Sequence, residues 1–237
     1  MSDTMQPADK LPVTPPTPTV AMLRTLGLIA ALAGFLVVLT YQVTTPMIEE
    51  NKRQAIERAL YQVLPGAESR RDFILDAAGI RPADAAGDAN GTRLYAGYDA
   101  DGKLVGVALE AAAQGYQDII RVLYGYDPAC QCIRGIQVLK MAETPGIGDK
   151  IAKDPRFLAN FEALDARVDE ATGGLSNAIV AVKSGKKTQT WQIDAISGAT
   201  ISSNAVARML DTSAQSILPQ LRAHLDRLTS PSAGGRQ

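Results

Sequence analysis

The sequence predicts an α+β domain in which antiparallel sheet hairpins pack with helices, preceded by one N-terminal transmembrane helix. Three observations support this fold class. An uncharged apolar segment lies near the N-terminus, β-rich runs recur in pairs around turn residues, and a helical periodicity fills the C-terminal part. A length of 237 residues suits one domain of common size with an anchor or a tail.

The N-terminal part is predicted to anchor the chain in a membrane. Residues 1–21 are rich in proline and polar side chains, which is typical of a disordered tail. Residues 22–45 are predicted as the transmembrane helix, because no charged side chain occurs from Thr25 to Met47 and about 20 apolar residues span a hydrocarbon core. A cleavable signal peptide is the alternative, but the segment is long for one and no A-x-A site follows. Lysines and arginines on the two flanks leave the orientation open.

Residues 46–66 are predicted as a helix that connects the anchor to the domain. Ile56, Leu60 and Val63 recur at roughly helical spacing, and the sequence LPG at 64–66 ends the helix. The domain itself is predicted to cover residues 67–228, followed by a C-terminal tail at 229–237.

Three hairpins are predicted in the domain, each from two β-rich runs that flank a turn. They cover residues 93–112 with a turn at Asp101–Gly102, 119–141 with a turn near Pro128, and 178–194 with a turn at Ser184–Gly185. A long helix over 202–225 follows from apolar residues at helical spacing, with a kink or break expected at Pro219.

Charge, histidine and cysteine content exclude several classes of function. The net charge of −1 gives no basic field that would attract nucleic acid. His224, the single histidine, argues against polyhistidine metal sites, His-ligated haem and a Ser-His-Asp triad. Cys130 and Cys132 cannot complete a metal site alone, so we expect two thiols or an unusual disulfide in a hairpin turn, with a redox or intersubunit metal role as the less favoured alternative. We predict no metal site and assign no catalytic residue.

The run DAISGATISSNAV, residues 194–206, combines small residues and hydroxyls between a predicted strand and a predicted helix. A helix N-terminus exposes unpaired N–H groups and holds phosphate favourably. Gly198 and Ala199 allow close backbone approach, Thr200 places a hydroxyl where a phosphate would lie, and Asp194 could orient that hydroxyl or mark the site for a modifying enzyme. Ordinary capping by serine and threonine is the alternative.

The same residues resemble a known family. Asp194, Ser197, Gly198, Ala199 and Thr200 match the D-x-x-(S/T)-G-A-T motif of covalent FMN-binding domains. The resemblance implies that Thr200 carries FMN through a phosphoester bond made by a flavin transferase. The run is more similar to the G subunit of the Rnf electron-transport complex than to the C subunit of the sodium-translocating NADH:quinone reductase.

Two further segments share the resemblance. ETPGIGDKI, residues 143–151, is similar to the E-T-P-G-(L/I)-G segment of the family, although Met141 stands where the family often has a histidine. Its loop is expected to approach the flavin ring through Gly146 and Gly148, while Glu143 and Thr144 offer polar contacts. A simple turn is the alternative. A looser match, residues 111–127, resembles the Gly-Tyr segment and the strand after it.

The resemblance implies an electron-transfer subunit of a membrane-bound ion-translocating oxidoreductase complex, with FMN as cofactor and little activity alone. It further implies other complex subunits and a flavin transferase as partners, and an inner-membrane location with the domain on the periplasmic or outer side. Two alternatives remain open: a membrane-tethered binding or assembly module without redox chemistry, and an anchored FMN-dependent reductase.

Overall fold

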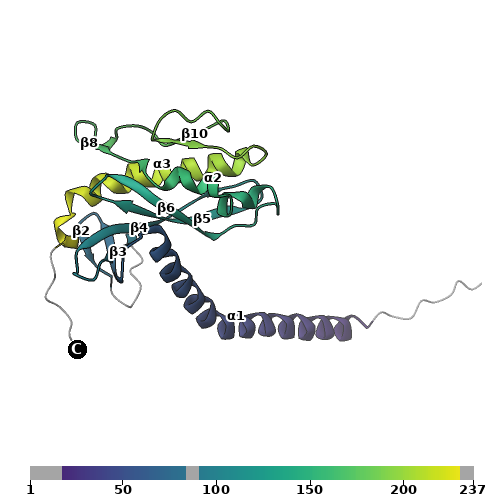
Figure 1. Cartoon of the computed structure of the whole chain (residues 1–237). Coiled ribbons are helices and arrows are strands. Elements are labelled where there is room, and N and C mark those ends of the chain that lie inside the picture. Colours follow the sequence, from purple (N-terminus) through teal and green to yellow (C-terminus); the bar gives the residue numbers. More distant parts are fainter. Residues whose placement is uncertain (1–17, 84–90, 230–237) are drawn as a thin grey trace, which may run out of the picture. The chain divides into compact units, whose positions relative to one another are not determined.

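The computed structural model describes residues 18–83 and 91–229, so the two predicted tails lie almost wholly outside the described residues (Figure 1). The chain divides into two compact units, Met1–Asn51 and Lys52–Gln237. The helix α1, Thr19–Val63, runs through both.

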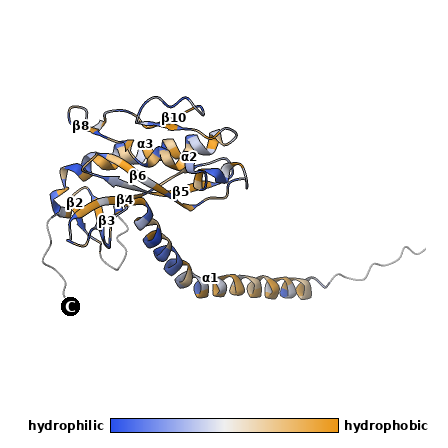
Figure 2. Cartoon of the chain, viewed as in Figure 1, coloured by the Kyte–Doolittle hydropathy of each residue, from blue (hydrophilic) through white to orange (hydrophobic). Residues whose placement is uncertain are grey.

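The first unit contains the apolar stretch of α1. Among the described residues, α1 alone is long and apolar enough to cross a membrane, and the side chains of its apolar stretch are exposed. Figure 2 colours this stretch mostly orange, in contrast to the hydrophilic residues that follow it in the helix. Pro46 lies inside α1 without ending it.

The second unit is built on a seven-stranded antiparallel sheet with the order β2-β1-β3-β4-β5-β6-β7. Its strands are β1 Ser69–Asp76, β2 Gly79–Pro82, β3 Thr92–Tyr98, β4 Leu104–Gln114, β5 Ile119–Asp127, β6 Cys132–Lys140 and β7 Leu164–Asp165. The first two predicted hairpins are therefore confirmed as β3–β4 and β5–β6, and Gly102 adopts the positive φ expected of the first turn.

Helices and two small sheets complete the unit. The helical segments are η1 Gly148–Ala152, α2 Pro155–Leu158, η2 Ala159–Phe161, α3 Thr200–Ala223 and α4 Asp226–Thr229. The small sheets pair β8 Val168–Asp169 with β9 Gly174–Leu175, and β10 Val180–Val182 with β11 Gln192–Asp194. Figure 1 shows α3 between the large sheet and the small ones.

Both faces of the large sheet are covered. Successive side chains of a strand point to opposite faces, so each face contributes its own set of buried residues. Leu109 and Tyr124 pack with Leu210 of α3 in the main core. On the other face, Tyr95 and Leu123 pack with the last turns of α1, whose buried residues are Ala59, Leu60 and Val63. The predicted α+β class with antiparallel hairpins is thus confirmed.

One local prediction is wrong, and a second is wrong in part. The segment 178–194 does not form a hairpin, because β10 and β11 pair in parallel, with Val180 opposite Gln192. The turn at Ser184–Gly185 therefore belongs to a longer connection, which leads from the end of β10 back to the level at which β10 begins. Pro219 does not break α3, which continues to Ala223 because buried Ile217, Leu218 and Leu221 hold its last turns in the core. The kink that was the other expectation stays a prediction.

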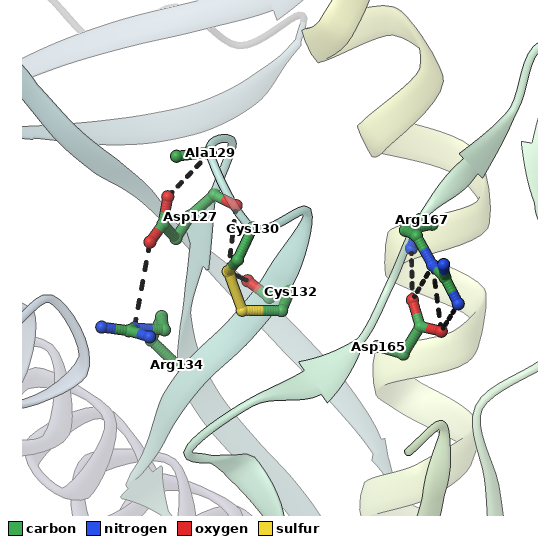
Figure 3. The surroundings of a disulfide bond; sticks show 7 residues. All are labelled: Asp127, Ala129, Cys130, Cys132, Arg134, Asp165 and Arg167. Carbon is green, nitrogen blue, oxygen red and sulfur yellow. Dashed lines mark hydrogen bonds and ion pairs between the residues drawn. A yellow bond between two sulfur atoms is a disulfide. The ribbon is translucent and has the colours of Figure 1, made fainter. Parts of the chain in front are cut away.

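The C-x-C sequence forms the second of its expected alternatives, a disulfide (Figure 3). Cys130 lies in the β5–β6 turn and Cys132 is the first residue of β6, with their Cα atoms 5.2 Å apart. Gln131 between them has a φ of +52°. The Gln131 side chain accepts a hydrogen bond of 3.1 Å from Arg222 near the end of α3. The turn is therefore tied to the helix that begins within residues 194–206, the DAISGATISSNAV segment, which is called the SGAT run below.

Candidate functional site

The SGAT run connects β11 directly to α3. Ala199 is the N-cap of the helix and provides no side-chain hydrogen bond. Gly198 has a φ of +87°, a conformation that favours glycine, and the space beside it is open. The first helical hydrogen bond runs from Ser203 N to Ala199 O, and no carbonyl of the described residues accepts from the amides of Thr200, Ile201 and Ser202. These three N–H groups are available to an anion.

Thr200 presents an exposed hydroxyl at this helix start. Among the hydrogen bonds formed between described residues, none involves its side chain. No serine or threonine side chain caps this helix start, so the capping alternative is wrong. Buried Ser203 instead accepts from Ile196 N at 3.1 Å and donates to Ala199 O at 2.9 Å. Thr200 is thus free for other chemistry.

Glu143, which follows β6, is buried and joins three segments. Its Oε1 accepts hydrogen bonds from the amides of Tyr116 at 2.9 Å and Gln117 at 3.3 Å, in the turn between β4 and β5. Its Oε2 accepts from the Ser202 hydroxyl at 2.5 Å, on the first turn of α3. Gly148 is required beside it, because a Cβ there would stand 2.7 Å from Oε2. The three segments therefore meet at one buried carboxylate.

An open cavity of about 550 Å³ lies where these segments meet. Its polar lining comes from the predicted residues Glu143, Thr144 and Thr200, together with Ser202. Its apolar rim has side chains that are unusually exposed for their type: Tyr116 at 64%, Ile147 at 50% and Ile201 at 51%. The volume is within the range of small-molecule sites, and the rim suits a planar aromatic ring.

Six of the nine predicted cofactor-binding residues line this cavity: Glu143, Thr144, Gly148, Gly198, Ala199 and Thr200. Ser197, Gly146 and Asp194 do not. Gly146 instead donates from its amide to Asp149 at 2.7 Å within the loop. The hydrogen bond from Lys153, together with that from the Gly146 amide, lowers the pKa of the Asp149 carboxyl below its ordinary value.

Asp194 contacts the connection after β10. Its carboxylate accepts from the amides of Gly185 at 2.7 Å and Lys186 at 3.3 Å. Among the described residues no contact supports the expectation that it orients the Thr200 hydroxyl, while recognition by a modifying enzyme stays a prediction. Burial lowers the pKa of nearby Lys187, and the Asp194 carboxylate opposes this effect.

Four lining residues were not predicted: Tyr116, Ile147, Ile201 and Ser202. Tyr116 belongs to the Gly-Tyr segment, so the motif pointed to it without assigning a role. Ile147 and Ile201 stand next to predicted residues in sequence, and their exposure became visible only in three dimensions. Ser202 was not predicted because its role depends on the hydrogen bond to Glu143, a residue distant in the sequence.

Comparisons with known proteins agree with this arrangement. The FMN-binding domain family matches residues 115–215, which include every residue lining the cavity, and the RnfG N-terminal region matches residues 24–63.

Curated relatives from two organisms are similar to the chain, and both are G subunits of an ion-translocating oxidoreductase complex. The protein from Methanosarcina acetivorans is 32% identical over 83% of this chain and 93% of its own. The protein from Aliivibrio fischeri is 31% identical over 77% of this chain and 82% of its own.

Crystal structures of NqrC from Shewanella oneidensis and of the C subunit of the Na⁺-translocating NADH-quinone reductase from Parabacteroides distasonis share the fold. The TM-scores are 0.59 and 0.54, with 20% and 21% identity, covering 76% and 78% of this chain and 98% and 97% of theirs. By its similarity to the curated relatives, the chain belongs to the family of G subunits of ion-translocating oxidoreductase complexes.

Proposed function

We propose that the chain is an electron-transfer subunit of a membrane-bound ion-translocating oxidoreductase complex and carries FMN as a phosphoester of Thr200. The observation that supports this most directly is the exposed Thr200 hydroxyl, which has no partner among the described residues. It stands at the start of a 24-residue helix, on the wall of an open cavity. The family membership and the match to the FMN-binding domain support the same cofactor.

The residues present fit the two halves of FMN. The three available amides at residues 200–202 and the dipole of α3 would hold the phosphate, which keeps a negative charge as a diester. Tyr116, Ile147 and Ile201 would pack against the flavin ring, and Thr144 would face its polar edge. Bound FMN supplies the electron-transfer chemistry, while these residues fix its position and exclude water from part of its surface.

The buried hydrogen bonds of Glu143 would keep this site in shape. The carboxylate fixes the Tyr116 backbone and the first turn of α3 at the same time. A rigid site suits electron transfer, because a fixed distance and a fixed environment hold the rate and the potential constant. The chain alone would then show little turnover, because donor and acceptor belong to other subunits of the complex.

We further propose that α1 anchors the chain as a single-pass protein of the inner membrane, with the domain on the periplasmic or outer side. Exposed apolar side chains over the predicted span 22–45 support the anchor. The Cys130–Cys132 disulfide supports the outer side, because disulfides persist in oxidising compartments and are rare in the cytoplasm. A flavin transferase acting on the same side would attach the cofactor.

The intact mass of the full chain, purified from membranes of cells that contain a flavin transferase, tests the proposal. We expect an increase of about 440 Da, equal to FMN less one water, as a covalent modification. An unmodified mass in colourless material would contradict the flavoprotein function and favour the binding-module alternative. Steady turnover of the isolated chain with an added donor would instead favour an anchored reductase.

A further inference from the structure

A second cavity, of about 450 Å³, lies on the opposite face of the large sheet from α3. All its lining residues belong to the unit Lys52–Gln237. They come from the last part of α1, from β4 and β5, and from the end of β6, and they are Lys52, Ala55, Ile56, Glu110, Arg121, Leu139 and Lys140. None of them lines the flavin site.

The lining is amphipathic, with an apolar part and a cationic part. Ile56 and Leu139 are partly buried and continue the cluster that packs the end of α1 on the sheet. Lys52, Arg121 and Lys140 provide three cations, against the single carboxylate of Glu110. The net charge of the lining is therefore positive and suits an anion that also carries apolar groups.

The Glu110 carboxylate pairs with one of these cations, Arg121, and not with the two lysines. Glu110 accepts hydrogen bonds from the Tyr95 hydroxyl at 2.9 Å and from Arg121 at 3.2 Å, so both of its oxygens are engaged. Lys140 stands 3.9 Å from Asp118, and both side chains are about half exposed or more, at 67% and 48%. Lys52 forms no ion pair with any of the described residues, and it is exposed.

The chain connects this cavity directly to the apolar segment. Met47 ends the uncharged stretch, and Lys52 follows five residues later in the same helix. Five residues of chain span at most about 18 Å in any conformation, and the polar headgroup layer of a bilayer is about 5–7 Å thick on each side. The covalent connection therefore limits how far Lys52 can lie from that layer.

We propose that this cavity binds the phosphate of an anionic phospholipid headgroup, such as phosphatidylglycerol. The cations would hold the phosphodiester, while Ile56 and Leu139 would contact the glycerol and the first part of the acyl chains. The proposal rests on the membrane anchor proposed above and is independent of the flavin site.

Native mass spectrometry of the full-length flavinylated chain in detergent micelles tests it, with added phosphatidylglycerol and phosphatidylcholine compared as ligands. Replacing Lys52→Gln and Lys140→Gln together should weaken phosphatidylglycerol binding by roughly five-fold for each cation removed. A matched double variant, Lys103→Gln with Lys183→Gln, removes the same charge from side chains outside the cavity and should bind as the wild type does. Phosphatidylcholine binding should not differ among the three proteins.

Ala55→Trp fills the cavity without changing any charge, and it should also reduce phosphatidylglycerol binding. Equal losses in the two double variants, or unchanged binding in both Ala55→Trp and the Lys52/Lys140 variant, would overturn the proposal.

Inorganic phosphate, added as a competitor, should displace the lipid poorly. Displacement at concentrations similar to those of the lipid would assign the cavity to a free anion instead. Extraction of membranes at alkaline pH distinguishes failure of the lipid site from failure of the membrane anchor, because a chain released by this treatment would refute the anchor itself.

Discussion

Ser202, on the first turn of α3, donates a 2.5 Å hydrogen bond to Oε2 of Glu143, 59 residues earlier in the chain. This contact joins the SGAT run to the ETPGIG segment, and the other oxygen of Glu143 adds the turn that contains Tyr116. The three segments of the predicted flavin site are therefore held by one buried carboxylate.

Glu143→Gln should destabilise the fold. The new NH₂ group cannot accept a hydrogen bond, so either the Ser202 hydroxyl or the amides of Tyr116 and Gln117 lose their acceptor. A buried group without a partner costs about 1–3 kcal/mol, and each kcal/mol lowers the melting temperature by about 2–4 °C for a domain of this size. Thermal denaturation of the full chain measures the shift. Glu162→Gln, at an exposed position, is the control, and equal shifts would contradict the role of Glu143.

Thr200→Val should abolish covalent flavin, because valine keeps the shape of threonine and removes the hydroxyl that forms the ester. In-gel fluorescence under ultraviolet light after denaturing electrophoresis, together with intact mass, reports the loss. Thr200→Ser should retain some covalent flavin, and Ser216→Ala, at an exposed position of α3 outside the cavity and the motif, should load normally. A fluorescent band that survives in Thr200→Val would assign the attachment to another residue.

Asp194→Ala should loosen the connection after β10. Without the carboxylate, the amides of Gly185 and Lys186 lose their acceptor, and local opening should raise the rate of tryptic cleavage at Lys183, Lys186 and Lys187 several-fold. Limited proteolysis followed by mass spectrometry measures this rate.

Asp194→Asn separates the two roles of this residue. The amide oxygen can still accept both hydrogen bonds, so the cleavage rate should stay near that of the wild type. Covalent flavin that falls in both variants would mean that the negative charge itself is recognised during attachment. Flavin loading that is normal in Asp194→Ala would show that neither the charge nor the loop is needed.

Asp165 should make stability depend on pH. Its carboxylate forms a 2.6 Å ion pair with Arg167, whose hydrogen bonds lower the pKa of Asp165 in the folded state. The unfolded value is about 3.9. Stabilisation by the ionised carboxylate is therefore present above that pH and disappears as the pH falls through the lower, folded value.

Asp165→Asn should accordingly cost about 1–3 kcal/mol of unfolding free energy at neutral pH, and the difference from the wild type should shrink as the pH is lowered below about 4. Denaturant titrations at several pH values measure it. Asp101→Asn, at an exposed turn, should differ little from the wild type at any pH. A cost of Asp165→Asn that stays constant down to pH 2 would show that the charge of the carboxylate contributes nothing.

Much of the fold could be predicted because its signals are local. Turn residues between β-rich runs identify β3–β4 and β5–β6, and the apolar spacing identifies α3. The third predicted hairpin failed because a strand pattern does not encode its partner's direction: β10 and β11 are joined by a connection that Asp194 fixes from a distance along the chain. The helix does not break at Pro219, because burial of the last turns outweighs one lost helical hydrogen bond.

The sequence by itself determined the chemistry that the chain offers: an apolar segment of membrane length, a small-residue helix start, and a threonine with a hydroxyl at that start. Only the tertiary structure decided which groups share a site. It showed that Glu143 contacts Ser202, that Tyr116, Ile147 and Ile201 form an exposed apolar rim, and that Asp194 faces a loop. The physical reason is that hydrogen bonds and burial depend on distances in space between segments far apart in the chain, whereas helix starts, turns and apolar spans depend on neighbouring residues.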